Sequence, residues 1–190
     1  TIDFNECPRS TPRCVFALSK GIMKPGMGER NALFLRLGMW YRNQGFTTKE
    51  QLLSDLDVAR KILYQTRPTA VNLAWGLDKI MQVATQGNDV IAIKNLIVKT
   101  AQEMAEDDIK INMQMGKNGS VLFNNNDTIM THCNAGSLAT VAYGTALGVI
   151  RATKESGKNV KVIATETRPV QQGSRLTAFE LKHDGFDVSL

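Results

Sequence analysis

Cys133 is the residue of this sequence best placed to do chemistry. It stands in the run THCNAGSLAT at residues 131–140, after the apolar pair Ile129-Met130 and before apolar residues at helical spacing. This pattern predicts a strand, a tight turn and a helix, with the thiol at the carboxyl end of the strand. Open parallel sheets bind ligands at that edge, and a thiol at a helix start favours its reactive thiolate form. The alternative is a buried core cysteine, because free cysteine is often buried.

A second group of polar residues follows the next apolar run, near residue 166. Arg168, Gln172 and Arg175 flank Gly173, which opens a further helical pattern. Arginine side chains, an amide and the free amides of a helix start can hold a phosphate or sugar hydroxyls. Spacing alone favours the simpler alternative, a capped helix start with solvated arginines.

Three further candidates are weaker. Arg67 precedes Pro68 and a helical pattern, so it is either a phosphate clamp at a helix N-terminus or a surface arginine beside a proline at the first helical position. Asp107-Asp108 reads as a solvated helix face, because no His or Cys stands at metal-ligand spacing. His132 is adjacent to Cys133 and points to the opposite face of a strand, which makes it a poor base for the thiol.

Composition narrows the class of protein. The chain has 190 residues, 43% of them hydrophobic and 22% charged, with a net charge of +5 and three cysteines. The charges are dispersed, so a nucleic-acid partner is not expected, although a basic chain tolerates anionic ligands. An odd cysteine count does not make a disulfide framework, and we expect a reducing, cytoplasmic setting. No run approaches the roughly 20 apolar residues of a membrane span.

The elements that must position these residues change in type along the chain. Helical spacing predicts helices over residues 15–22, 31–44, 48–62, 69–84 and 90–115, with a capping box at 47–50 and a loop at 116–127. Strands are predicted at 128–132 and 159–166, helices at 137–156 and 173–183, and a further strand after residue 190. The fold class is α/β: a helical N-terminal region followed by a partial Rossmann-like parallel β-α-β-α unit. We divide the chain into 1–56, 57–118 and 119–190.

Several long motifs, in order, resemble one enzyme family. Residues 58–182 closely resemble methylthioribose-1-phosphate isomerases, which form a larger group with the regulatory subunits of initiation factor 2B and with ribose-1,5-bisphosphate isomerase. The matching runs are TRPTAVNLAW at 66–75, AEDDIKIN at 105–112, THCNAGSLAT at 131–140, YGTALGVIR at 143–151, and ETRP through QGSRLTA at 166–178. The Cys-Asn-Ala-Gly run followed by Ala-Thr is typical of the isomerase branch.

The resemblance implies an activity and a set of residues. It implies that Cys133 is catalytic, that Arg67 and Gln172 line the substrate pocket, and that Asn134, Ala135 and Gly136 contact substrate. The family converts 5-methylthioribose 1-phosphate to 5-methylthioribulose 1-phosphate in methionine salvage, without an organic cofactor or a required metal. We expect a homodimer that binds a small sugar phosphate and no membrane. The alternative is a non-catalytic initiation factor 2B-like binding or regulatory module.

Two parts of the sequence depart from this pattern. The second catalytic residue of the family, an aspartate in a Gly-Ala-Asp-Arg motif, and its Arg-Gly-Ala-Pro phosphate motif are absent from these 190 residues. We therefore expect weak or no turnover from the 190-residue chain alone. Residues 1–56 do not resemble the isomerase. Residues 7–46 resemble the helical region of DNA primase large subunits, but Cys7 and Cys14 cannot build a four-cysteine cluster, so a divergent helical segment is the favoured reading.

Overall fold

The computed structural model describes residue 45 and residues 48–190. The described residues form two compact units, one reaching residue 104 and the other covering 105–190. The helices predicted at 15–22 and 31–44, and with them Cys7 and Cys14, lie outside the described residues. The division of the chain at residues 56 and 118 stays a prediction.

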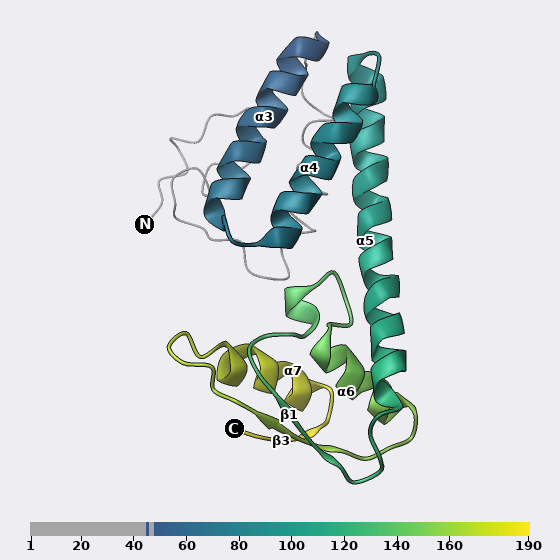
Figure 1. The fold of residues 1–190 in the computed structure, drawn as a ribbon, viewed down its shortest axis with the longest axis vertical. Coiled ribbons are helices and arrows are strands. Elements are labelled where there is room, and N and C mark those ends of the chain that lie inside the picture. Colours follow the sequence, from purple (N-terminus) through teal and green to yellow (C-terminus); the bar gives the residue numbers. More distant parts are fainter. Residues whose placement is uncertain (1–44, 46–47) are drawn as a thin grey trace. The chain divides into compact units, whose positions relative to one another are not determined.

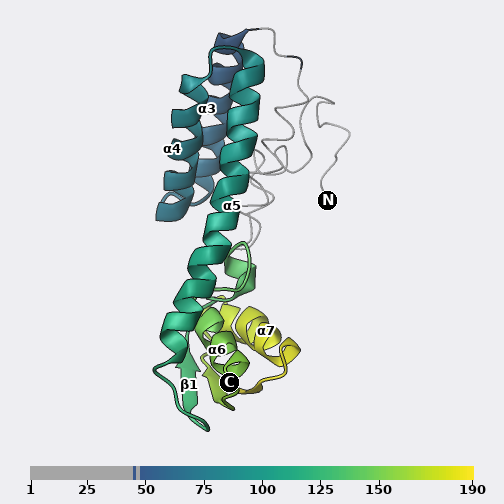
Figure 2. The ribbon, with the colours of Figure 1, turned by 90° about the vertical axis from the view of Figure 1, so that its right-hand side faces the viewer.

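The first unit is helical, as its apolar spacing predicts. Helix α3 (Lys49–Thr66) packs on α4 (Val71–Gln86), and the first part of α5 (Val90–Ser120) lies alongside them (Figures 1 and 2). One apolar cluster holds the three helices together and contains Leu52, Leu56, Leu63, Leu73, Leu77, Ile80, Ala84, Ile93, Ile97 and Ala101.

Two polar contacts define the ends and the pairing of these helices. The cap of α3 lies one residue later than predicted, because the side chain of Thr48 accepts a hydrogen bond from the Gln51 amide at 3.2 Å. On the surface, Arg60 joins α3 to α4 by donating to Asp78 from Nε at 2.9 Å and from Nη2 at 2.6 Å. An exposed pair of this kind adds little stability, so the apolar cluster is the main attachment between the helices.

Helix α5 continues beyond the predicted end at residue 115 and stops at Ser120. The glycines that indicated a loop, Gly116 and Gly119, lie inside the helix. A Cβ on Gly116 would meet the Gly148 carbonyl at 2.8 Å, and one on Gly119 would meet the Val149 side chain at 2.7 Å. These glycines therefore allow the helix that contains Gly148 and Val149 to approach α5 closely, and they do not end it.

The second unit is built on a three-stranded parallel sheet, which confirms the predicted fold class. Strand β2 (Lys161–Ala164) lies between β1 (Thr128–Thr131) and β3 (Asp187–Ser189). Thr131 pairs with Ala164, and Lys161 pairs with Asp187. The third strand was predicted beyond residue 190 and is already formed at 187–189. The strands are shorter than predicted because the chain turns out of the sheet directly after β1 and β2.

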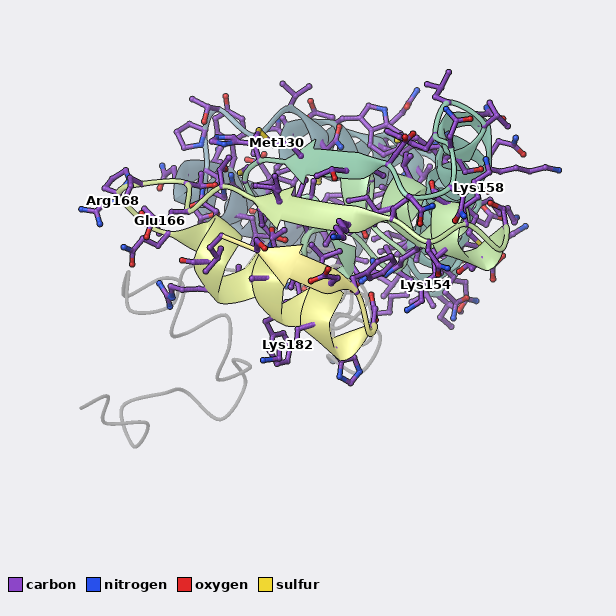
Figure 3. The ribbon with its side chains drawn as sticks, turned by 90° about the horizontal axis from the view of Figure 1, so that it is seen from below. Met130, Lys154, Lys158, Glu166, Arg168 and Lys182 are labelled. Atoms are coloured by element: carbon purple, nitrogen blue, oxygen red, sulfur yellow. The ribbon has the colours of Figure 1, made fainter. Side chains whose placement is uncertain are left out.

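Helices α6 (Ala146–Glu155) and α7 (Ala178–His183) cover one face of this sheet (Figure 1). The shared core contains Ile129, Leu147, Ile150, Val160, Val162 and Leu181. On the other face Met130 is 67% exposed, and Figure 3 shows it on β1. Alternation along the strands therefore separates a buried face from an exposed one.

The helix predicted over 137–156 is wrong in its first half. A single short 3-10 turn, Ser137–Ala139, follows Cys133, and α6 begins only at Ala146. Tyr143 (φ 73°) and Gly144 (φ 83°) are both left-handed, which interrupts a helix between these two elements. The apolar residues from 138 to 142 belong to an irregular, partly exposed segment, in which Leu138 is 40% exposed, and not to a continuous helix.

Among residues 45 and 48–190, no helix combines the length and the apolar character that crossing a membrane requires.

Candidate functional site

Cys133 lies where the sequence predicts it, just past the carboxyl end of β1. Its amide donates to Thr167 Oγ1 at 3.0 Å, and its carbonyl accepts from Thr177 Oγ1 at 2.6 Å. Its backbone is left-handed, with φ 67°, which is uncommon for a residue other than glycine. Two threonines from different segments thus hold the backbone of Cys133 in an unfavourable conformation, and its side chain is half-buried. Strained backbone of this kind is often found at functional sites.

Gln172 is the side chain that the structure places on the sulfur. Its Nε2 donates to Cys133 Sγ at 3.4 Å, across the edge shared by β1 and β2. Directly after it, Gly173 packs so closely on the end of β2 that a Cβ would collide with the Thr165 carbonyl. The first turn, Gly173–Thr177, has the wide π-helical geometry and continues into α7. The contact between residues 133 and 172 therefore depends on a glycine between strand and helix.

The three residues after the cysteine form a buried or half-buried loop. The Asn134 Oδ1 accepts from the Gly136 amide at 3.4 Å, and the Ala135 carbonyl accepts from the amides of Thr145 (3.0 Å) and Leu147 (3.2 Å). These two bonds attach the loop to the start of α6. The start of α6 lies well along the chain from Cys133, so the helix-start amides predicted beside the thiol are not formed by α6.

Two buried polar atoms beside the cysteine have no hydrogen-bond partner among the described residues. They are Nδ2 of Asn134 and Oε1 of Gln172. Asn134 is only 5% exposed. Buried polar atoms are usually paired, because an unpaired group loses its bonds to water without replacement. Asn134 Nδ2 is therefore free to donate and Gln172 Oε1 is free to accept, and such a pair of groups can bind the hydroxyls of a ligand.

Sequence reasoning missed a buried ionic cluster behind this loop. Glu180 of α7 is 4% exposed and accepts from Arg151 Nη2 at 2.9 Å, while Arg151 Nε donates to Asp184 at 2.7 Å. Burial lowers the pKa of the Arg151 guanidinium, but its bonds to Glu180 and Asp184 outweigh that effect and hold the pKa above its ordinary value. The available signal was a lone carboxylate at 180 between the apolar Phe179 and Leu181, on a helix that packs on the sheet.

The segment before α6 is fixed by further polar contacts. Asp108 accepts from the Val141 amide at 2.9 Å and from Asn112 Nδ2 at 3.1 Å, so it is bonded to the loop and is not simply a solvated face as predicted. Burial, together with the bond that its hydroxyl donates to Glu155 at 2.7 Å, raises the pKa of Tyr143 to about 12. Both contacts secure the segment that follows the cysteine loop.

His132 is exposed, and its described contact is away from the sulfur. Its Nδ1 lies 2.6 Å from Thr165 Oγ1, which lies 3.3 Å from Thr167 Oγ1. Because Thr167 also accepts from the Cys133 amide, His132 is connected to the backbone of the cysteine and not to its thiol. This arrangement agrees with the expectation that strand alternation turns His132 away.

The arginines lie in different places. Arg67 is half-buried in the first unit, at the end of α3, where its amide donates to the Tyr64 carbonyl at 3.2 Å. Arg168 and Arg175 are exposed in the second unit. Figure 3 shows the side chains of Glu166 and Arg168 pointing away from the sheet at its carboxyl end. Of the site residues predicted from sequence, those that the structure brings together in the second unit are Cys133, the run from 134 to 136 that follows it, and Gln172, whose Nε2 reaches the sulfur.

Known proteins share this sequence and this fold. A model of the initiation factor 2 subunit family matches residues 31–190. A protein of Archaeoglobus fulgidus named putative methylthioribose-1-phosphate isomerase is 46% identical over 149 residues, which cover 78% of this chain and 44% of that protein. Residues 31–56, which we expected to differ from this group, therefore fall within the family match.

Solved structures give the same picture. The 5-methylthioribose 1-phosphate isomerase of Pyrococcus horikoshii is 36% identical, with a TM-score of 0.79, covering 93% of this chain and 50% of that one. A structure described as translation initiation factor eIF-2B, subunit delta, from A. fulgidus is 40% identical, with a TM-score of 0.77, covering 93% of this chain and 53% of that one. The chain thus spans about half the length of the relatives it matches.

Proposed function

The chain belongs to the initiation factor 2 subunit family, and on that premise we propose that it acts as a sugar-phosphate aldose–ketose isomerase of methionine salvage. The proposed reaction converts 5-methylthioribose 1-phosphate to 5-methylthioribulose 1-phosphate. The observation that carries the proposal is the thiol of Cys133, held at the carboxyl edge of a parallel sheet with Gln172 Nε2 at 3.4 Å from its sulfur. The names of the relatives supply the substrate.

The chemistry fits a thiol flanked by neutral polar groups. Substrate and product are isomers: the bond between C1 and the ring oxygen breaks and that oxygen gains a proton, the hydrogen on C2 ends on C1, and the C2 hydroxyl loses its proton as the C2–O bond becomes a carbonyl. No external oxidant is consumed. Each proton movement needs a positioned acid or base, and a thiol with an amide donor beside it can supply one of them. The proposed steps use groups of the protein, without an organic cofactor or a metal.

The other residues receive roles that match their contacts. Gln172 and Asn134 offer an unpaired acceptor and an unpaired donor to sugar hydroxyls, and Ala135 and Gly136 shape the loop against which the sugar lies. Arg67 is assigned to the phosphate because a guanidinium binds phosphate oxygens in pairs. A homodimer and a cytoplasmic location complete the proposal; β1 and β3 are the edge strands of the described sheet, and such edges favour pairing with another chain.

A non-catalytic initiation factor 2B-like module is the alternative. The likeness to the A. fulgidus structure of that description supports it. The isomerase is favoured because a binding module has no need for a cysteine in a left-handed conformation with an amide on its sulfur.

Cys133 is expected to be alkylated faster than Cys7 and Cys14, and 5-methylthioribose 1-phosphate is expected to protect it. The substrate would cover the thiol, which lies half-buried at the carboxyl edge of the sheet with Gln172 Nε2 donating to its sulfur. Iodoacetamide labelling of each cysteine, quantified by peptide mass spectrometry against pH, measures both effects, with ribose 5-phosphate as the matched control ligand. Equal rates at all three cysteines, together with no protection, would contradict the isomerase proposal.

An Arg67→Ala variant is expected to lower kcat/KM strongly with little change in melting temperature. The reason is that the proposed partner of its guanidinium is the substrate phosphate, while both described hydrogen bonds of Arg67 are made by its backbone. Steady-state kinetics on the complete gene product, with Arg60→Ala as a surface-arginine control, provide the measurement. A large loss of stability with unchanged kinetics would make Arg67 a structural residue.

A further inference from the structure

The loop that follows Cys133 is held from behind by a single carboxylate. Oε2 of Glu180 accepts from the Ser137 amide at 2.7 Å and from the Ser137 hydroxyl at 2.6 Å, while Oε1 accepts from the Leu138 amide at 3.3 Å. Glu180 belongs to α7, far along the chain from Ser137. A residue of one crossover helix therefore fixes the turn that leaves the neighbouring strand.

This carboxylate also packs directly against the backbone of the loop. A Cβ on Gly136 would collide with the Glu180 side chain, so the backbone at Gly136 rests directly on the carboxyl group. Gly136 has φ −97°, which any residue adopts, so the glycine is required here by space and not by conformation. The Glu180 carboxylate therefore contacts the loop both at the Gly136 backbone and at the amides of Ser137 and Leu138.

The charge of Glu180 is compensated by Arg151. The guanidinium lies 2.9 Å from Glu180 and 2.7 Å from Asp184, and its side chain is 13% exposed. Arg151 Nη1 also donates to the Tyr143 carbonyl. The same ion pair thus reaches both the beginning of the segment between β1 and α6, through Ser137, and its end, through Tyr143.

We propose that Glu180 is a positioning residue for Cys133, acting through Ser137 and Leu138. Its carboxylate sets the path of the loop from 134 to 138, and that path sets where the thiol and the buried Asn134 side chain stand. The proposal rests on the isomerase function proposed above, in which Cys133 is the reacting group. Displacement of a reacting group by about 1 Å can cost about 10²-fold in rate, so a support of this kind is functionally important.

The contacts make a distinction that an experiment can use. Arg151 is bound by two carboxylates, but of these two only Glu180 contacts the loop, while Asp184 contacts Arg151 and lies behind it. Glu180→Gln and Asp184→Asn remove the same charge from the same arginine. If the cluster served only to fasten α6 to α7, the two variants would behave alike.

The test compares these variants by the rate of Cys133 alkylation against pH, with melting temperature measured beside it. We expect the rate at Cys133 to change about tenfold in Glu180→Gln and to stay within about twofold of the parent in Asp184→Asn, as displacement of the thiol requires. Cys7 and Cys14 provide internal standards in every sample. Equal changes in the two variants, or an unchanged rate in Glu180→Gln, would overturn the proposal.

Two further variants keep the proposal falsifiable if Glu180→Gln does not fold. Ser137→Ala removes the hydroxyl donor to Glu180 without touching Arg151, and Glu180→Asp keeps the charge but withdraws it from the loop. Both are expected to shift the Cys133 rate in the same direction as Glu180→Gln. Parent-like rates in both would overturn the positioning role. Absence of turnover in the parent gene product would instead contradict the isomerase function. The difference in Cys133 alkylation rate between Glu180→Gln and Asp184→Asn would still test the positioning role.

Discussion

A Cys133→Ser variant is expected to lose turnover of 5-methylthioribose 1-phosphate by about 10²- to 10⁴-fold, the range for removing a group that transfers a proton. Serine has the same shape as cysteine with a somewhat smaller terminal atom, and its hydroxyl can still accept from Gln172, but that hydroxyl is a far weaker acid. Stability should change little, because the described bonds of Cys133 are made by its backbone, with Gln172 alone on the sulfur. The loss would therefore be chemical and not structural.

The measurement of this variant uses the complete gene product, so that any carboxylate outside these 190 residues is present. Cys7→Ser and Cys14→Ser are the matched controls and should retain parental kcat. Binding of substrate to Cys133→Ser, followed by calorimetry, separates lost chemistry from lost affinity. Parental turnover in Cys133→Ser would remove Cys133 from the catalytic machinery.

A Gly173→Ala variant is expected to destabilise the second unit by about 1–3 kcal/mol, the usual cost of an extra methylene in a packed site. The new methyl group would collide with the Thr165 carbonyl. That strand end cannot move aside freely, because the Thr165 amide is bonded to the Thr131 carbonyl at 3.1 Å. Because Gln172 precedes Gly173, its contact with the sulfur should be lost as well.

Urea denaturation monitored by circular dichroism measures the free energy of unfolding. The rate of Cys133 alkylation reports whether Gln172 still contacts the sulfur. The control is Gly45→Ala, because a Cβ at Gly45 would have no atom within 4 Å. Without the collision, an alanine at position 173 would be expected to stabilise the protein by up to about 1 kcal/mol, because Gly173 lies in a helical turn and alanine favours helix more than glycine does. A Gly173→Ala protein as stable as its parent would show that the strand end yields without cost.

The parallel arrangement and the meeting of residues 133 and 172 could be predicted from sequence. Alternating apolar residues define the strands, and parallel neighbours bring their carboxyl ends to one edge. The glycines at 116 and 119 misled the prediction, because a glycine that ends a helix and one that lets another helix approach look the same in a sequence. What decides between them is the neighbour, Gly148 or Val149, which only the tertiary structure supplies.

Glu180 was missed for a related reason. Its partners, Ser137 and Arg151, are distant in the chain and come from two other elements. Local pattern places a carboxylate on a helix but does not say which face is buried against a turn. A helix over 137–156 would also have left the amides of Ser137 and Leu138 unpaired in its first turn, so the sequence offered the donors without indicating which distant carboxylate accepts from them.

The contact between Gly136 and Glu180 also has an evolutionary consequence. The volume that a side chain at position 136 would occupy is already filled by the carboxylate from position 180. A side chain at position 136 therefore requires the Glu180 carboxylate to move off its bonds to Ser137 and Leu138, so enlarging position 136 costs less after position 180 has been shortened. We therefore expect substitutions at positions 136 and 180 to be correlated among related sequences, although the two positions lie far apart in the chain.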